Sequence, residues 1–192
     1  MGLPKRSLYG CGSTTYDGSS SSKEGDSTYK PKCRTRRDDW PVLVFEAGVS
    51  ETLARLDADW WLTKSNGEVK IAIVISIVPA RKSLLIEQWC MPLPPPTRPG
   101  PVTRARTSAI TTAITTNTNT TVPTCLQELT VIQDPPIPPL PGTIPTYTVI
   151  GAPLTLDFEK LLLRAPVPPE GNVIFTAADL QQWAGTFWSN VI

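Results

Sequence analysis

Glu46 is the residue of this chain best placed to do chemistry. It ends the apolar run 42–46, VLVFE, and Gly48 then turns the chain into an expected helix. An acidic side chain at a strand end is held rigidly at the edge of a sheet, where a metal ion or a substrate can reach it. The alternative interpretation is structural: the carboxylate caps the following helix or forms a salt bridge. The sequence leaves both interpretations open.

The residues after Gly48 have helical spacing. The expected helix runs to about Thr63, with Ser50 as its N-cap. Its apolar residues recur at spacings of four, three and four: Val49, Leu53, Leu56 and Trp60. Because this spacing lines one face of a helix, we expect these side chains to pack onto the sheet. Val69–Val78 then predicts a central strand, since it is apolar on both faces.

Shorter elements are expected after this block. Strands are predicted at Ser83–Trp89, at Glu128–Gln133, within Tyr147–Phe158 and at Val173–Phe175. A final helix follows, with Thr176 and Asp179 spaced as a capping box. Its bulky apolar stripe, Leu180, Trp183, Phe187 and Trp188, is expected to pack onto the sheet.

The length of the chain, 192 residues, suits one domain, which we expect over residues 26–192. Residues 1–25 are rich in Gly, Ser and Thr and predict a flexible tail. Of the 21 prolines, 13 lie between Pro92 and Pro145. Proline lacks the backbone donor that regular structure needs, so residues 91–127 are expected to form a low-complexity Pro/Thr-rich insertion.

The composition excludes several kinds of site. The chain has no histidine, which removes Ser/His/Asp and Cys/His catalysis and histidine metal ligands. Its four cysteines form no CxxC pair, so a zinc ribbon is not expected. The net charge of +1 favours neither nucleic acid nor membranes by itself. No apolar run is long enough to span a bilayer and the start, MGLPKRSLYG, lacks a secretory core, so we expect an intracellular protein, cytoplasmic or nuclear.

Several stretches resemble a family of uncharacterised fungal proteins with a restriction-endonuclease-like core of the PD-(D/E)xK type. They are DSTYKP, PVLVFEAGVSETLARLDADWWL with VKIAIVISI, and GAPLTLDFEKLL. The same pattern is similar to a large bacterial group of predicted nucleases, in which an acidic strand end and a following serine open the helix. The resemblance implies an α/β fold: a restriction-endonuclease-like mixed sheet flanked by helices, here with the Pro/Thr-rich insertion.

The resemblance also implies a catalytic site. Such cores place an Asp and a Glu on adjacent strands, where they bind Mg²⁺, with a Lys beside them. Mg²⁺ accepts one or two carboxylates together with water and phosphate oxygens, and it can activate water for attack on a phosphodiester. On this sequence Glu46 matches the glutamate and Asp26 the aspartate. Asp57, on the expected helix, competes for the role of second carboxylate.

The lysine of the pattern is missing. Gly48 stands where the strand motif has its lysine, and no lysine occurs in the helix before Lys64. Lys70 is expected at an edge or on the surface. The resemblance therefore predicts a nuclease-like protein with weak or no hydrolysis, using Mg²⁺ if it is active and no cofactor otherwise.

The alternative function is a non-catalytic module that binds nucleic acid or protein. The run DSTYKPKCRTRR carries five basic residues that could contact phosphates: Lys30, Lys32, Arg34, Arg36 and Arg37. Trp60 and Trp61 could stack on bases, but adjacent helix positions point about 100° apart, so at least one is expected in the core. The proline-rich segments PLPPPTRPGP and PPIPPLP suit an extended ligand of a partner protein.

Overall fold

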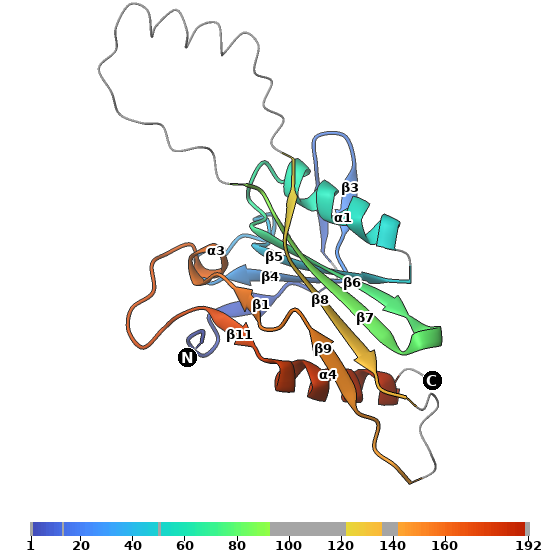
Figure 1. Cartoon of the computed structure of the whole chain (residues 1–192). Helices are drawn as coiled ribbons and strands as arrows, with labels where there is room; N and C mark the ends of the chain where they lie inside the picture. The colour runs from blue at the N-terminus through green and yellow to red at the C-terminus, as the bar shows by residue number, and fades with distance from the viewer. Residues whose placement is uncertain (1, 13, 50, 93–121, 136–141, 191–192) are drawn as a thin grey trace, which may run out of the picture.

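The chain folds around one large mixed sheet (Figure 1). The computed structural model describes residues 2–12, 14–49, 51–92, 122–135 and 142–190. The seven strands, in spatial order, are β1 (Leu8–Gly10), β4 (Ser27–Pro31), β5 (Leu43–Gly48), β6 (Ile71–Val78), β7 (Ser83–Cys90), β8 (Thr124–Gln133) and β9 (Tyr147–Ile150). All neighbours are antiparallel except β5 and β6, because helix α1 (Glu51–Lys64) crosses over between them. The predicted α/β class, with a mixed sheet and helices, is confirmed.

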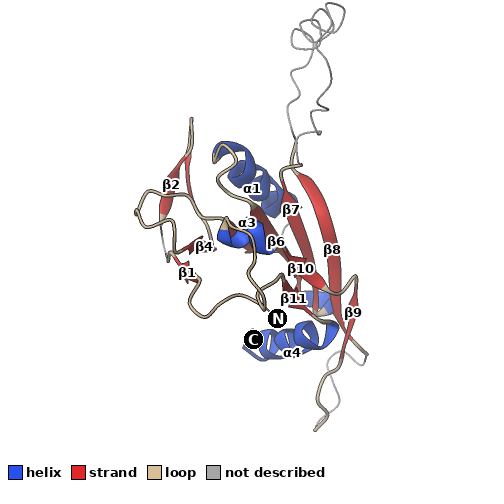
Figure 2. Cartoon of the chain, turned by 90° about the vertical axis from the view of Figure 1, so that its left-hand side faces the viewer, coloured by secondary structure: helices blue, strands red, loops and turns tan. Residues whose placement is uncertain are grey.

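Different elements cover the two faces of the sheet. One face carries α1 and a hairpin of β2 (Thr15–Asp17) and β3 (Ser22–Glu24), and we call it the α1 face. The other face carries α3 (Phe158–Leu162), the paired strands β10 (Leu154–Leu156) and β11 (Val173–Phe175), and α4 (Ala177–Asn190). A short 3-10 turn, Pro79–Arg81, joins β6 to β7. Figure 2 shows β2 beside α1, away from β7 and β8.

The sheet interior follows the predicted pattern. Residues 71–74 of β6 are buried as a continuous run, which confirms the expected central strand. The predicted hairpin partner is β7, and its apolar side chains join the core of the face opposite α1. The final helix begins at the predicted capping box, in which Thr176 and Asp179 bond to each other's backbone and side chains. Of its predicted stripe, Leu180 and Trp188 are buried, whereas Trp183 is 36% exposed.

Helix α1 forms where the spacing predicts it, but of the four residues predicted to line its apolar face two are exposed and Trp60 is partly buried. Val49 is 77% exposed and Leu56 is 60% exposed. The helix buries Ala58, Trp61 and Leu62 instead. The reason is polar as well as apolar, because the indole of Trp61 is turned inward to donate to a buried carboxylate of β5. The spacing of hydrophobic residues alone does not predict that hydrogen bond.

The first 25 residues differ from the expected flexible tail. Residues 8–10 form β1, which pairs with β4, and residues 15–24 form the β2–β3 hairpin. Tyr16 of β2 packs into the apolar cluster that includes Ala58 and Trp61 of α1, and glycine and serine residues form the turn of the hairpin.

The Pro/Thr-rich insertion falls mostly outside the described residues, which omit 93–121. The insertion was predicted to end at residue 127, but β8 starts at Thr124. Residues 124–127 therefore belong to a strand. None of the helices in the described part of the chain is long and apolar enough to cross a membrane.

Candidate functional site

The structure brings Asp26 and Glu46 to the same end of two neighbouring strands. Ser27 lies opposite Phe45 in the β4–β5 register. Continuing this register by one residue places Asp26 opposite Glu46, where Cβ atoms are typically about 5 Å apart. The Asp26 carboxylate also accepts a hydrogen bond of 2.8 Å from the backbone N–H of Ala47. Two carboxylates therefore converge at the edge that the sequence predicted.

Glu46 is buried on the α1 face, with only 5% of its surface exposed. Its Oε1 accepts a short hydrogen bond from Trp61 Nε1. Burial raises the pKa of Glu46, and the charges of Asp26 and Asp57 raise it further. The bond from Trp61 and the nearby charge of Lys23 oppose these effects only in part. Glu46 is therefore a buried carboxylate whose negative charge is incompletely compensated.

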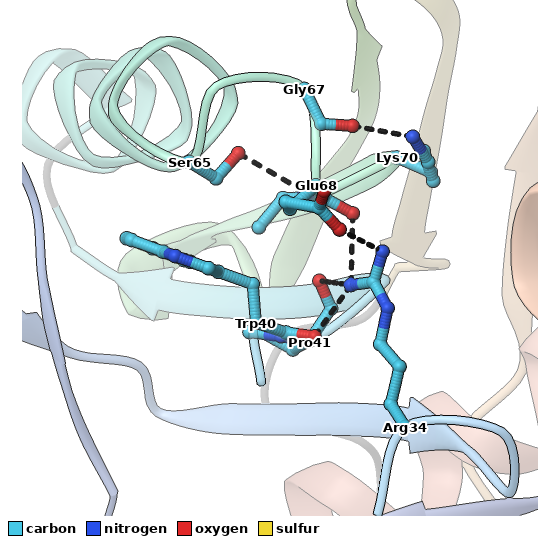
Figure 3. Close-up of polar contacts among 8 residues, drawn as sticks. Arg34, Trp40, Pro41, Ser65, Gly67, Glu68 and Lys70 are labelled. Carbon is cyan, nitrogen blue, oxygen red and sulfur yellow. Dashed lines mark hydrogen bonds and ion pairs between the residues drawn. The ribbon is translucent and has the colours of Figure 1, made fainter. Parts of the chain in front are cut away.

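Lys23 supplies a lysine where the sequence predicted none. Its Nζ lies 2.6 Å from Asp57 Oδ1 and 3.7 Å from Glu46 Oε1. It comes from β3, three residues before Asp26, within the stretch that the sequence assigned to a tail. The signal was present as a lysine close to the aspartate, but the β3 strand that aims it was not predicted. Lys64 is exposed, and Lys70 donates to the carbonyl of Gly67 (Figure 3).

Gly25 explains how the chain brings Lys23 and Asp26 so close to α1. A Cβ at Gly25 would lie 2.7 Å from Thr28 Cγ2 and 3.1 Å from Trp61 Cζ2. Any larger residue would push the end of the hairpin away from Trp61. Trp61 is fully buried, which confirms the expectation that one of the two tryptophans belongs to the core. Trp60 is partly buried and donates to Ser21 Oγ of the hairpin.

Glu46 and Asp57 both contact Lys23. The Glu46 carboxylate is turned toward Trp61, in the second half of α1, and forms a salt bridge with Lys23. Asp57 pairs with Lys23 at 2.6 Å, and its role as a second metal-binding carboxylate stays a prediction.

The acidic pair suits a hard cation with few protein ligands. Glu46 and Asp57 both contact Lys23, and repulsion from Asp26 and Asp57 adds to the burial that raises the pKa of Glu46. A divalent cation would relieve that repulsion. Among the described residues, no group of three or more Cys, Asp or Glu side chains could hold a metal ion. Asp26 and Glu46 are therefore two neighbouring carboxylates and do not by themselves form such a group.

The basic run is used partly by the fold itself. Arg34 is buried, and it donates to the carbonyls of Trp40, Pro41 and Glu68 and to the Glu68 carboxylate (Figure 3). Lys30 is buried as well and donates to the carbonyls of Arg36 and Arg37. These two side chains hold the loop before β5, so they are not available to phosphates. Lys32, Arg36 and Arg37 are exposed.

A second buried carboxylate lies on the α1 face. Glu87 of β7 is 2% exposed and receives three hydrogen bonds from Arg55 of α1, at 2.8, 2.8 and 3.1 Å. It lies opposite Val74, which in turn lies opposite Glu46. Glu128 of β8 continues the row and is exposed. The sequence analysis did not identify this row, because its members come from strands that are distant in the chain.

Comparisons with protein-family models, with curated proteins and with solved structures find no match to this chain. The proline-rich stretches proposed as protein ligands lie largely outside the described residues.

Proposed function

We propose that the protein is nuclease-like, with a restriction-endonuclease-like core of the PD-(D/E)xK type, and that it hydrolyses phosphodiesters with Mg²⁺. The observation that carries the proposal is the position of Lys23, whose Nζ lies 3.7 Å from Glu46 Oε1 beside Asp26. An Asp and a Glu on adjacent strands with a lysine beside them are the groups that this chemistry requires. The β4–β5–α1–β6 connection, antiparallel and then parallel, agrees with the core that the resemblance implies.

Each residue has a separate role in this proposal. Asp26 and Glu46 would hold Mg²⁺. When bound, Mg²⁺ would polarise a phosphate oxygen and activate a water molecule for attack. Lys23 places a positive charge next to the reacting phosphate and stabilises the charge that develops there. Asp57 positions the Lys23 ammonium at 2.6 Å. Because Glu46 is almost completely buried, we expect slow turnover.

The test is Mg²⁺-dependent cleavage of labelled single- and double-stranded DNA and RNA. We expect Glu46→Gln and Asp26→Asn to lower the rate by at least about 100-fold, and Lys23→Met by a similar factor. Glu128→Gln is the matched control, because it removes an exposed carboxylate from the same face of the sheet, and it should retain the wild-type rate. Cleavage at background level by the wild type, or equal rates in wild type and Glu46→Gln, would refute the proposal.

A further inference from the structure

The β2–β3 hairpin, residues 14–25, covers the carboxylate on which the proposed chemistry depends. We infer that this hairpin is a strap that lifts from Glu46 to admit Mg²⁺ and substrate and then closes again, which returns Lys23 of β3 to the site. The inference rests on the proposed function and adds a regulatory step to the same site. In the closed form described here, Glu46 is 5% exposed, and the side chains against its Oε1 are Trp61 and Lys23.

The hairpin is built as a separate unit. Its two strands pair only with each other and form a two-stranded sheet apart from the seven-stranded one. A two-stranded hairpin is marginally stable on its own, so its position depends on side-chain contacts with α1 and β5. Figure 2 shows β2 on the far side of α1 from β7, and Tyr16 of β2 packs against the large sheet at Lys30 of β4.

Three side chains of the hairpin, Tyr16, Ser21 and Lys23, hold the strap closed. Tyr16 is buried, stacks on Trp40 with ring centroids 5.4 Å apart, and meets the edge of Trp61 at 5.5 Å. Lys23 pairs with Asp57 at 2.6 Å, and Ser21 accepts a 2.7 Å bond from Trp60. The two polar contacts are partly exposed and therefore weak. Tyr16 is the main anchor, since it is the residue of the hairpin strands that the apolar core encloses.

The strap can be locked by a disulfide. A Cβ placed on Gly18 would lie 3.0 Å from Lys64 Cβ, and bridged cysteines have Cβ atoms about 3.8 Å apart. If the two Cβ atoms moved apart by less than about 1 Å, a disulfide could form in the double variant Gly18→Cys/Lys64→Cys. Cys11 and Cys33, which are free thiols, should be replaced by serine to prevent mispairing. Tyr16→Ala is the opposite variant, because it removes the anchor and should loosen the strap.

Access to Glu46 can be measured without any assay of activity. A water-soluble carbodiimide with glycine ethyl ester modifies accessible carboxylates, and peptide mass spectrometry counts adducts at Glu46, including cross-links to Lys23. We expect oxidation of the double-cysteine variant to slow modification of Glu46 by about tenfold relative to its reduced form. Tyr16→Ala should speed it by about tenfold. Glu87 is the internal control, since it is equally buried but lies two strands away under Arg55, and its rate should not change.

The outcomes separate the strap from the nuclease. Equal modification of Glu46 in the oxidised, reduced and Tyr16→Ala forms would overturn the strap. A locked form that cleaves nucleic acid as fast as its reduced form would also overturn it. If the lock slows modification of Glu46 but no form cleaves, the nuclease proposal fails while the hairpin still controls access. Because crowding at Gly18 could prevent the double variant from folding, Tyr16→Ala provides an independent test.

Discussion

Glu46 and Glu87 are both buried carboxylates on the α1 face of the large sheet. They lie two strands apart at the same register, roughly 10 Å from each other. Glu87 is matched by Arg55, which meets both of its oxygens at 2.8 Å. Glu46 has an indole N–H and a lysine at 3.7 Å, and burial raises its pKa.

The difference shows which of the two carboxylates serves the fold. A bidentate arginine offsets much of the cost of burying a charge, so Glu87 and Arg55 join α1 to β7. Glu46 is buried without an equal partner, and this arrangement costs stability. Uncompensated charge of this kind is typical of functional sites.

The largest effect on stability is expected at Glu87. Glu87→Gln should lower the free energy of unfolding by about 2 kcal/mol, because it removes the buried carboxylate that receives three hydrogen bonds from Arg55. This value lies below the usual range for a broken buried pair, because the Arg55 side chain is 40% exposed and can reach water. Urea denaturation followed by circular dichroism measures the change. A stability equal to that of the wild type would contradict the structural role of the pair.

Glu46→Gln should raise the free energy of unfolding near pH 8, whereas Glu87→Gln lowers it. Since burial raises the pKa of Glu46 above its ordinary value of 4.5, the folded protein binds this proton more tightly than the unfolded chain does. The stability that this tighter proton binding gives the folded protein is complete below pH 4.5 and is lost as the pH rises through the raised pKa of Glu46. Glutamine mimics the protonated form and can still accept from Trp61. We expect equal stabilities near pH 4 and a variant more stable by about 1 kcal/mol near pH 8.

The control for this prediction is Glu128→Gln, whose exposed carboxylate should change stability by less than about 0.5 kcal/mol at either pH. Loss of stability in Glu46→Gln at pH 8 would mean that Glu46 is compensated as well as Glu87 is.

The smallest effect is expected at Lys23. Lys23→Met should lower stability near pH 8 by about 0.5 kcal/mol, because the lysine is partly exposed and its attraction to Glu46 and Asp57 is screened. Lys64→Met, on the exposed side of α1, should leave stability unchanged. The same denaturation curves measure both variants. A loss as large as that of Glu87→Gln would show that Lys23 acts as a full counter-ion, and the distinction between the two carboxylates would fail.

The sequence predicted the strand–helix–strand block well because its signals are local. The apolar run of β6 and the capping box at Thr176 each depend on neighbouring residues, and each was correct, whereas Gly48, predicted as a turn, is the last residue of β5. The apolar face of α1 was predicted only in part, because α1 buries Ala58, Trp61 and Leu62, and Trp61 also donates a hydrogen bond to Glu46.

The candidate site was predicted only in part for the same reason. Asp26 and Glu46 were identified from their positions at strand ends. Lys23 was not, because its role depends on a hairpin whose Gly- and Ser-rich sequence resembles a tail and on one distant contact, Tyr16 against Trp40. Lys30 and Arg34 were predicted as ligands of phosphate, but the fold uses them to hold backbone carbonyls, which composition cannot reveal.

The most direct test of the account is calorimetric titration of Mg²⁺ and Mn²⁺ into the wild type, Glu46→Gln, Asp26→Asn and Glu128→Gln. We predict one binding site in the wild type and in Glu128→Gln, with affinity lower by at least about tenfold in the other two variants. Binding that is absent from the wild type, or equal in wild type and Glu46→Gln, would contradict the claim that the uncompensated carboxylate is a metal site.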